Sequence, residues 1–206
     1  MANEGKVNGF SWFGCLLAPF YDNIMKNNVF PRKFGSSYER HIDILKKELS
    51  DVHGLKVLDI ASGTGMISDC LGADNEITCT DISPYLLRLA GKKFGKQKMQ
   101  GYNLIVADAK DLPFEDNRFD VATCILALNF FSEPGKVIAE IQRTLKRTGK
   151  FVCSVPEASR LKAGSHITGT LFKEEDLRKL FVGSGMTFSP LPEENGSLLY
   201  FISRMS

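Results

Sequence analysis

The sequence lacks any long apolar run and any excess of charge of one sign. No apolar stretch approaches the roughly 20 residues that a membrane-spanning helix requires. Glu4 and Asn8 precede the first apolar patch and no basic region leads it, so the pattern of a signal peptide is missing. The net charge of +2 is by itself too small to indicate a nucleic acid partner. These absences predict a soluble cytoplasmic protein.

Paired cysteines are also missing. The chain has five cysteines, none of them in a C-x-x-C motif, so the sequence gives no support for a zinc site. Cys79, Cys124 and Cys153 lie inside apolar runs, where cysteine packs as a small hydrophobic residue in a reducing compartment. We therefore expect no metal site, and we expect Cys124 to have a core role rather than to act as a nucleophile.

At 206 residues, the chain is long enough for one α/β domain. We expect residues 1–54 to form an aromatic lid and a helical segment, and residues 55–206 to form a cofactor-binding core. A capping box, with Ser36 at the cap and Glu39 three residues later, predicts a helix that begins there and ends near Gly54.

From residue 55 onward, predicted strands and helices alternate. Apolar runs predict strands at 56–60, 76–80, 103–107, 119–126 and 150–155. Helices are predicted after the glycine turn at 61–65, after the cap at Ser83, and from Pro134 to a stop at Gly149. This alternation indicates a parallel sheet with helices on both faces.

The C-terminal tail departs from this alternation. After a helix with its stop at Gly183, two short strands are predicted at 186–189 and 198–202. The segment between them is too short for a helical crossover, so the two strands should pair antiparallel. The predicted fold is thus α/β and Rossmann-like, with a mostly parallel seven-stranded sheet and an antiparallel C-terminal hairpin.

The most informative segment is Val-Leu-Asp-Ile-Ala-Ser-Gly-Thr-Gly at 57–65. Gly63 and Gly65 would let the backbone come close to a ligand at the end of the first strand. Asp81 ends the second apolar run sixteen residues later, which is typical of a nucleoside-bearing cofactor bound across two adjacent parallel strands. A dinucleotide motif would have a third glycine where Met66 stands. The pattern therefore favours S-adenosylmethionine (SAM), which has no phosphate.

Three acids follow or end successive strands of the predicted sheet. Asp59 lies in the first strand, Asp81 ends the second, and Asp108 follows the third. A carboxylate has several acceptor sites and no donor, so Asp81 suits the two hydroxyls of a ribose. Asp108 lies where the amino group of an adenine would arrive. Three such acids together favour a nucleoside site over solvated strand ends.

These motifs resemble the class I SAM-dependent methyltransferases, most closely the group of quinone C-methyltransferases and phospholipid N-methyltransferases. The resemblance covers about residues 55–155 and includes T-D-I-S-P-Y-L-L, A-D-A-K-D-L-P-F-E-D-N-R-F-D and E-I-Q-R-T-L-K-R-T-G-K. Ala61 stands where the usual pattern has its first glycine, as it does in quinone methyltransferases. The resemblance implies an enzyme that transfers a methyl group from SAM by direct in-line displacement.

The resemblance also implies the role of each site residue. The methionine part of SAM would be lined by Asp59, Ala61, Ser62, Gly63 and Gly65. Asp81 would hold the ribose, with Ile82 against the adenine, Asp108 and Ala109 at the adenine edge, and Leu126 facing the sulfonium. Tyr21-Asp22-x-x-Met25 resembles a segment that closes over the cofactor and the transferred methyl group.

The methyl acceptor is predicted to be a small apolar or amphiphilic molecule. Its pocket should form from the aromatic N-terminus, residues 129–131 and the loop at 156–170, although the same aromatics could simply cap the core. No general base is evident. The catalytic candidates are Tyr21, Asn129 and His166, whereas His41 and His53 are expected on the surface.

Other interpretations stay open at this point. The chain could be a non-catalytic SAM-binding module that acts through a partner protein, or an NAD-dependent oxidoreductase. Residues 10–20, with Trp12 and Phe13, could also contact a membrane surface.

Overall fold

The computed structural model describes residues 21–99, 101–161 and 167–206. The predicted membrane contact at 10–20 and the catalytic candidate His166 lie outside these residues. Within the described ranges, none of the helices combines the length and apolar character that crossing a membrane requires.

A single seven-stranded sheet forms the centre of the molecule, in the order β3-β2-β1-β4-β5-β7-β6. The bounds of its strands are β1 Lys56–Ile60, β2 Glu76–Asp81, β3 Gly101–Val106, β4 Phe119–Ile125, β5 Leu145–Pro156, β6 Ser189–Pro190 and β7 Leu198–Ser203. Strands β1 to β5 pair in parallel, and β7 pairs antiparallel with both β5 and β6. The predicted fold class, including the antiparallel C-terminal pair, is confirmed.

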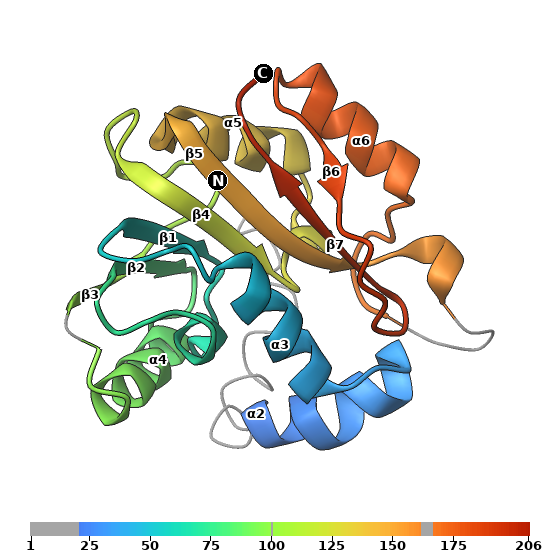
Figure 1. Cartoon of the computed structure of the whole chain (residues 1–206), viewed down its shortest axis with the longest axis horizontal. Coiled ribbons are helices and arrows are strands. Elements are labelled where there is room, and N and C mark those ends of the chain that lie inside the picture. The colour runs from blue at the N-terminus through green and yellow to red at the C-terminus, as the bar shows by residue number, and fades with distance from the viewer. Residues whose placement is uncertain (1–20, 100, 162–166) are drawn as a thin grey trace, which may run out of the picture.

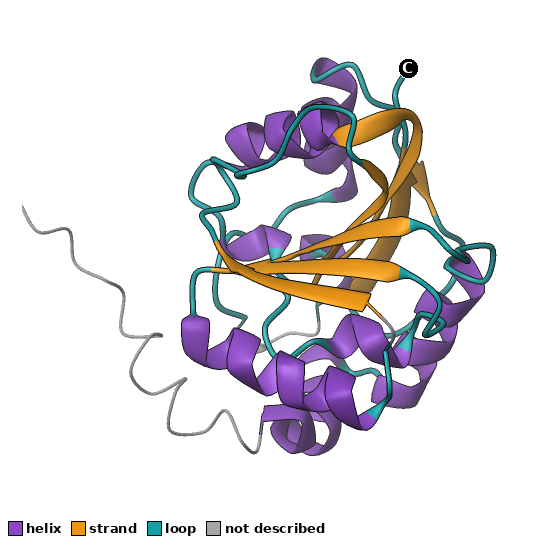
Figure 2. Cartoon of the chain, turned by 90° about the vertical axis from the view of Figure 1, so that its left-hand side faces the viewer, coloured by secondary structure: helices purple, strands orange, loops and turns teal. Residues whose placement is uncertain are grey.

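Helices cover both faces of the sheet (Figures 1 and 2). One face packs against α3 (Tyr38–Glu48) and α4 (Pro84–Lys96), and the other against α5 (Pro134–Thr144) and α6 (Glu174–Gly183). Successive strand residues point to opposite faces. Val57 therefore joins the core under α3 and α4, while its neighbour Leu58 joins the core under α5 and α6.

Two helix starts follow from serine caps, one of them a residue later than predicted. Ser83 caps α4, because its hydroxyl accepts a hydrogen bond from the N–H of Leu86 at 3.3 Å. Ser37, rather than Ser36, caps α3 by accepting from the N–H of Arg40 at 3.3 Å. Ser36 is occupied elsewhere: its N–H and its hydroxyl both donate to the carbonyl of Phe30 at the end of the preceding helix.

The helix α5 is shorter than predicted, and β5 is longer. The helix ends at Thr144 and the chain becomes extended at Leu145, which pairs with Phe119 of β4. Gly149 therefore lies inside β5 and is not a helix stop. A Cβ atom there would come within 2.9 Å of the carbonyl oxygens of Asp120 and Lys146, so the position needs glycine for a close backbone approach.

The helix α6 ends at Gly183, as predicted. The left-handed conformation that follows the helix belongs to Gly185, with φ of 77°. The N–H of Met186 then returns to the carbonyl of Phe181 at 3.0 Å, as expected beyond a left-handed helix terminus.

An N-terminal helical segment packs against the rest of the chain. It consists of α2 (Tyr21–Ile24) and η2 (Met25–Phe34), a π-helix that contains Pro31. Phe30 and Phe34 share one buried cluster with Val57 and Tyr200. The N–H of Ser197 donates to the carbonyl of Phe34 at 2.8 Å, so the loop before β7 supports the end of η2.

Candidate cofactor site

The glycine turn follows β1 and has an unusual backbone. Ala61, Gly63 and Gly65 all have positive φ, at 54°, 55° and 79°. A Cβ atom on Gly65 would lie 2.7 Å from the ring of Phe94, so this glycine is needed for packing against α4. A Cβ atom on Gly63 would meet no atom of the described residues within 4 Å. As far as these residues go, the space beside Gly63 is open to a ligand.

Ser62 fixes the turn against β2. Its N–H donates to the carbonyl of Thr80 at 2.9 Å, and its hydroxyl donates to the carbonyl of Asp59 at 2.7 Å. Both groups are buried. Because the two contacts use the backbone of neighbouring strands, the turn is held at the carboxyl end of the sheet.

Asp59 is a buried carboxyl group at the base of the turn. Only 3% of the residue is exposed, and the hydroxyl of Thr123 on β4 donates to its Oδ1 at 2.6 Å. Burial raises the pKa of Asp59 to about 7, and the negative charge of Asp81 adds to this increase. Asp59 therefore changes its charge within the neutral pH range.

Asp81 joins the turn to β2. Its Oδ2 accepts a hydrogen bond from the N–H of Gly63 at 2.9 Å, and its Oδ1 accepts from the N–H of Ser83 at 2.9 Å. A carboxylate has about four acceptor sites, so two remain for a ligand. Two residues that the sequence analysis assigned to one cofactor are thereby in direct contact.

The residues at the predicted adenine side of the site are more exposed than Asp59 and Ser62. Ile82 is 76% exposed and Val106 is 56% exposed, although both lie at the carboxyl ends of strands in the sheet. The Oδ1 of Asp108 accepts from the N–H of Lys110 at 3.0 Å, and about half of its side chain is exposed. Ala109 is buried in the core, so only its backbone could reach a ligand.

Leu126 lies directly after β4 and has a φ of 57°, a rare conformation for a branched side chain. Its N–H donates to the carbonyl of Ser154 on β5 at 2.9 Å. Leu126 and Ala61 thus place two non-glycine residues in the left-handed region at the ends of the neighbouring strands β4 and β1. Such strain collects at functional sites.

Replacing Ala61 with glycine should raise the free energy of unfolding by up to about 1 kcal/mol. The left-handed conformation costs an alanine about 1–2 kcal/mol, and the added freedom of glycine in the unfolded chain offsets part of this gain. Urea unfolding of the variant would measure the difference. Ala107, after β3, has a negative φ, so Ala107→Gly should be destabilising. Equal destabilisation by both substitutions would contradict the prediction.

The segment with the Tyr21-Asp22-x-x-Met25 pattern lies beside the glycine turn. The hydroxyl of Thr64 donates to Oδ1 of Asp22 at 2.7 Å. Met25 is 6% exposed and packs into the core. The position of the Tyr21 side chain is outside the described part of the structure, so its catalytic role stays a prediction.

Asn129, another catalytic candidate, holds the loop that follows β5. Its Nδ2 donates to the carbonyl of Thr168 at 2.8 Å, and its own carbonyl accepts from the N–H of Thr170 at 2.7 Å. Between them Gly169 has φ of 98°, and a Cβ atom there would lie 2.3 Å from the Asn129 carbonyl oxygen. Asn129 thus joins two of the segments from which the acceptor pocket was predicted.

The prediction for His41 was wrong, because this residue is fully buried. Its Nδ1 lies 2.8 Å from the hydroxyl of Tyr200, and burial lowers the pKa of His41 to about 3. It is therefore neutral and inaccessible at physiological pH. The helical spacing of Tyr38, Ile42 and Leu45 could have indicated this burial, since residue 41 lies on the same face of the helix. His53 is exposed, as predicted.

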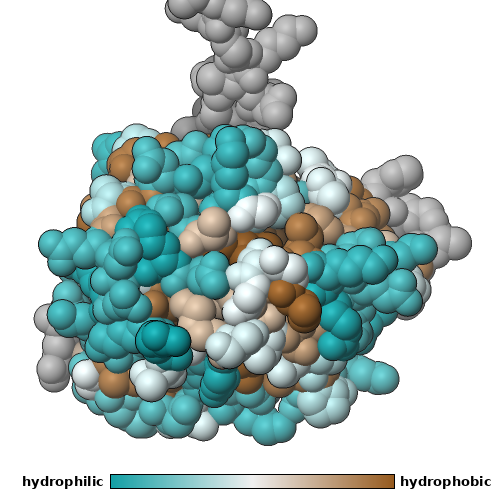
Figure 3. All heavy atoms as spheres, turned by 90° about the horizontal axis from the view of Figure 1, so that it is seen from above, coloured by the Kyte–Doolittle hydropathy of each residue, from teal (hydrophilic) through white to brown (hydrophobic). Residues whose placement is uncertain are grey.

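A groove of about 550 Å³ lies between α3, the short helix η3 (Met66–Asp69) and the residues that follow α4. Tyr38, Asp69 and Met99 are among its lining residues, but Asp59 and Asp81 are not. Within the described ranges, no group of three metal-ligating side chains occurs. On the side seen in Figure 3, apolar side chains form a broken band within a mainly hydrophilic surface.

Several known proteins that are similar to this chain are methyltransferases. Residues 58–153 match the family model described as a methyltransferase domain. This match covers somewhat less than half of the 206 residues. Over 140 residues it is 33% identical to demethylmenaquinone methyltransferase of Staphylococcus aureus (strain MRSA252), a match that covers 65% of this chain and 54% of that protein.

Another curated relative and a solved structure are also named as methyltransferases. Over 102 residues the chain is 36% identical to the ubiquinone/menaquinone biosynthesis C-methyltransferase UbiE of Idiomarina loihiensis, covering 47% of this chain and 41% of the relative. The matched region spans about half the length of these curated relatives or less. A solved SAM-dependent methyltransferase of Clostridium acetobutylicum ATCC 824 shares the fold, with a TM-score of 0.73 at 16% identity, covering 91% and 98% of the two chains.

The region that the family model matches contains most of the predicted site but not all of it. Asp59, Asp81, Asp108 and Leu126 fall within the matched residues 58–153. Asp22 and the loop at 167–170 lie outside them. The contacts of Asp22 with Thr64 and of Asn129 with Thr168 therefore connect the matched region to two segments that flank it.

Proposed function

We propose that this protein is a SAM-dependent methyltransferase that acts on a small apolar or amphiphilic acceptor. The observation that supports the proposal most directly is the 2.9 Å hydrogen bond from the N–H of Gly63 to Asp81, the two positions from which a nucleoside site was predicted. The match of residues 58–153 to a methyltransferase domain supports the same reaction. The acceptor and the roles of individual residues are part of the proposal.

The described residues fit the chemistry of SAM. Free space beside Gly63 leaves room for the methionine part, and the buried carboxyl group of Asp59 lies below it. The two remaining acceptor sites of Asp81 suit the ribose hydroxyls. The exposed side chain of Ile82 offers an apolar surface for the adenine, with Asp108 and the backbone of Ala109 at its edge.

The methyl donor needs little activation from the protein, because SAM carries its methyl group on a positively charged sulfur. The chain would mainly align the acceptor and exclude water, and alignment can contribute about 7–11 kcal/mol. We assign this work to Leu126 at the end of β4 and to the loop that Asn129 holds. Tyr21, Asn129 and His166 stay candidates for any proton transfer that the acceptor requires.

The described surface around the loops after β4 and β5 favours an apolar acceptor. Phe130 is 51% exposed and Leu171 is 38% exposed, and both follow these two strands. The names of the relatives refer to menaquinone and ubiquinone biosynthesis. A quinone precursor is therefore the first acceptor to test.

Incubation with radiolabelled SAM and demethylated quinone precursors should yield a labelled, extractable product. The amount of S-adenosylhomocysteine formed should equal the amount of product. A panel of phospholipid amines and small phenols would serve as the comparison. Saturable binding of SAM without turnover of any acceptor would instead favour the non-catalytic module, and binding of NAD alone would favour the oxidoreductase.

A cytoplasmic location is part of the proposal. Within the described ranges, four cysteines, at 70, 79, 124 and 153, are free and buried. Unpaired thiols are typical of a reducing compartment. Cell fractionation with an antibody against the chain would test this location, and recovery in an extracytoplasmic fraction would contradict it.

A further inference from the structure

A lysine on α4 connects three separate segments near the glycine turn. Nζ of Lys93 lies 2.6 Å from Oδ2 of Asp69 on η3 and 3.3 Å from Oδ2 of Asp22 on α2. The Lys93 side chain is only 19% exposed, although lysine usually extends into water. Its ammonium group therefore lies between two carboxylates at a partly buried position.

Asp22 carries this connection to the glycine turn. While Oδ2 of Asp22 faces Lys93, its Oδ1 accepts from the hydroxyl of Thr64 at 2.7 Å. Thr64 stands between the two glycines of the turn and is 7% exposed. Within the described residues of α2, Asp22 is the one whose side chain has a hydrogen bond or ion pair to the α/β core.

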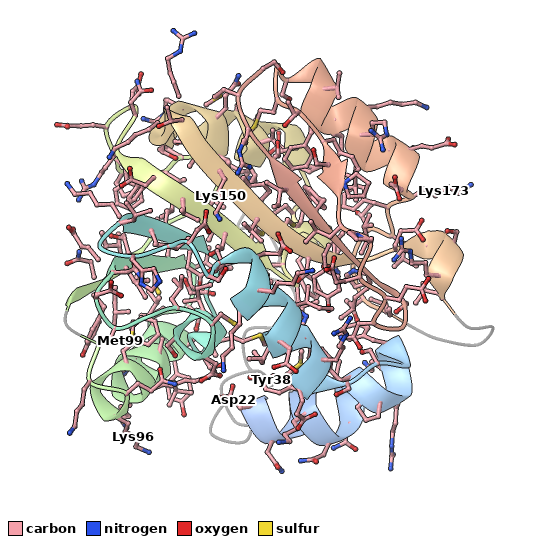
Figure 4. The ribbon with its side chains drawn as sticks, viewed as in Figure 1. Asp22, Tyr38, Lys96, Met99, Lys150 and Lys173 are labelled. Carbon is pink, nitrogen blue, oxygen red and sulfur yellow. The ribbon has the colours of Figure 1, made fainter. Side chains whose placement is uncertain are left out.

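Asp69 anchors the other side of Lys93. Its Oδ2 also accepts from the hydroxyl of Tyr38 at 3.2 Å, and its Oδ1 accepts from Nε2 of Gln97 at 2.7 Å. Burial and the negative charges of Asp69 and Asp22 raise the pKa of Tyr38, so its phenol stays a hydrogen-bond donor. Figure 4 shows Asp22 and Tyr38 close together below α3.

These contacts make Lys93 the shared partner of the two acids. Without its charge, Asp22 and Asp69 would face each other with no cation between them, and like charges repel. The hydrogen bond between Asp22 and Thr64 would then be weaker. About half of the Asp22 side chain is exposed, so water could replace this contact. The position of α2 beside the glycine turn thus depends on a residue of α4.

We infer that Lys93 is a positioning residue, which keeps Asp22 and the N-terminal helix α2 against the glycine turn where the methionine part of the cofactor binds. Lys93 acts through Asp22 and Thr64 and has no contact with the reacting atoms. This inference rests on the proposed function only for the identity of the cofactor. The arrangement of α2, Asp22 and Lys93 can be tested in the absence of any ligand.

Lys93→Met should weaken the binding of S-adenosylhomocysteine about tenfold, within the range of coupling between linked sites. Calorimetry would give the dissociation constant. Hydrogen exchange of the ligand-free protein should become faster in residues 22–34. Lys93→Arg keeps the charge and should restore most of both properties. Lys92→Met is the matched control, because Lys92 is an exposed neighbour on the same helix, and it should change neither.

A double variant tests the route through Asp22. Asp22→Asn keeps an oxygen that can accept from Thr64 but removes the charge that Lys93 holds. If Lys93 acts through Asp22, the double variant should bind the ligand no more weakly than Lys93→Met alone, whereas additive losses would overturn that route. Unchanged binding and unchanged exchange in Lys93→Met, or equal losses in Lys92→Met, would overturn the inference itself. A wild type that does not bind the ligand would refute the proposed function, while hydrogen exchange would still decide the role of Lys93.

Discussion

Replacing Asp81 with alanine should weaken the binding of S-adenosylhomocysteine by at least about 100-fold. Hydrogen bonds to a charged group contribute about 1.5–3 kcal/mol each, and two ribose hydroxyls would lose their acceptor together. The variant should also lose some rigidity in the turn, because Asp81 accepts the N–H groups of Gly63 and Ser83. Isothermal titration calorimetry of the purified variant would measure the loss.

The control for this experiment lies on the same strand. Glu76 is the exposed first residue of β2, at the opposite end from Asp81, so Glu76→Ala should leave the affinity unchanged. Asp81→Asn offers a milder test, since its amide keeps one acceptor oxygen but turns a donor toward Gly63 or Ser83. A folded Asp81→Ala variant with wild-type affinity would mean that the ribose is bound elsewhere.

Replacing Asp59 with asparagine should stabilise the ligand-free protein at neutral pH while weakening cofactor binding. The pKa of Asp59 rises from 3.8 to about 7 on folding, mainly because the group is buried. Its favourable contribution to stability is therefore fully present below pH 3.8 and is lost as the pH rises toward 7. Asparagine stays neutral throughout and can still accept from the hydroxyl of Thr123.

The increase in the free energy of unfolding caused by Asp59→Asn should thus grow from near zero at pH 4 to a value on the order of 4 kcal/mol at pH 7 and above. Guanidinium unfolding of variant and wild type at several pH values would measure it. Calorimetry with S-adenosylhomocysteine would show the functional loss. A difference in stability that does not depend on pH would contradict the assigned pKa.

Asp120, on the neighbouring strand β4, provides a control in which the pKa is shifted in the opposite direction. Burial opposes its ionisation, but the ammonium of Lys146 at 2.6 Å and the N–H of Lys56 outweigh this and lower the pKa of Asp120. Its stabilising contribution is present above pH 3.8 and disappears as the pH falls through the lowered value. Asp120→Asn should therefore be destabilising at neutral pH, in contrast to Asp59→Asn.

The strands β1, β2 and β4 could be predicted from the sequence because each is an apolar run with clear limits, whereas β6 was predicted at 186–189 and is observed at Ser189–Pro190. The first strand was predicted at 56–60 and is observed at Lys56–Ile60, since Gly54 precedes it and the glycine turn follows it. Glycines gave less certain information. Gly149 and Gly183 were both predicted as helix stops. The helix α6 does end at Gly183, whereas Gly149 lies inside β5 and permits a close backbone approach. The sequence alone does not show whether a glycine ends a helix or permits a close approach of two backbone segments.

Only those residues of the candidate site that lie at the ends of strands could be predicted from the sequence. Asp59, Gly63 and Asp81 follow from the order of the strands, and the structure brings Gly63 and Asp81 into contact. The contacts of His41 with Tyr200, of Thr64 with Asp22 and of Lys93 with Asp69 join distant positions. No local pattern encodes such pairs, because they depend on how α2, α3 and α4 pack together.

The support that the loop before β7 gives to η2 has a consequence for the order of assembly during synthesis. The carbonyl of Phe34 accepts from the N–H of Ser197, and the backbone of Ser37 both donates to and accepts from the side chain of Asn195, about 160 positions later in the chain. A nascent chain that has not yet emerged beyond residue 190 can pair β1 to β5 but still lacks the hydrogen-bond partners of Phe34 and Ser37. The hydrogen bonds that fix the junction between η2 and α3 therefore form only after the loop before β7 has been synthesised.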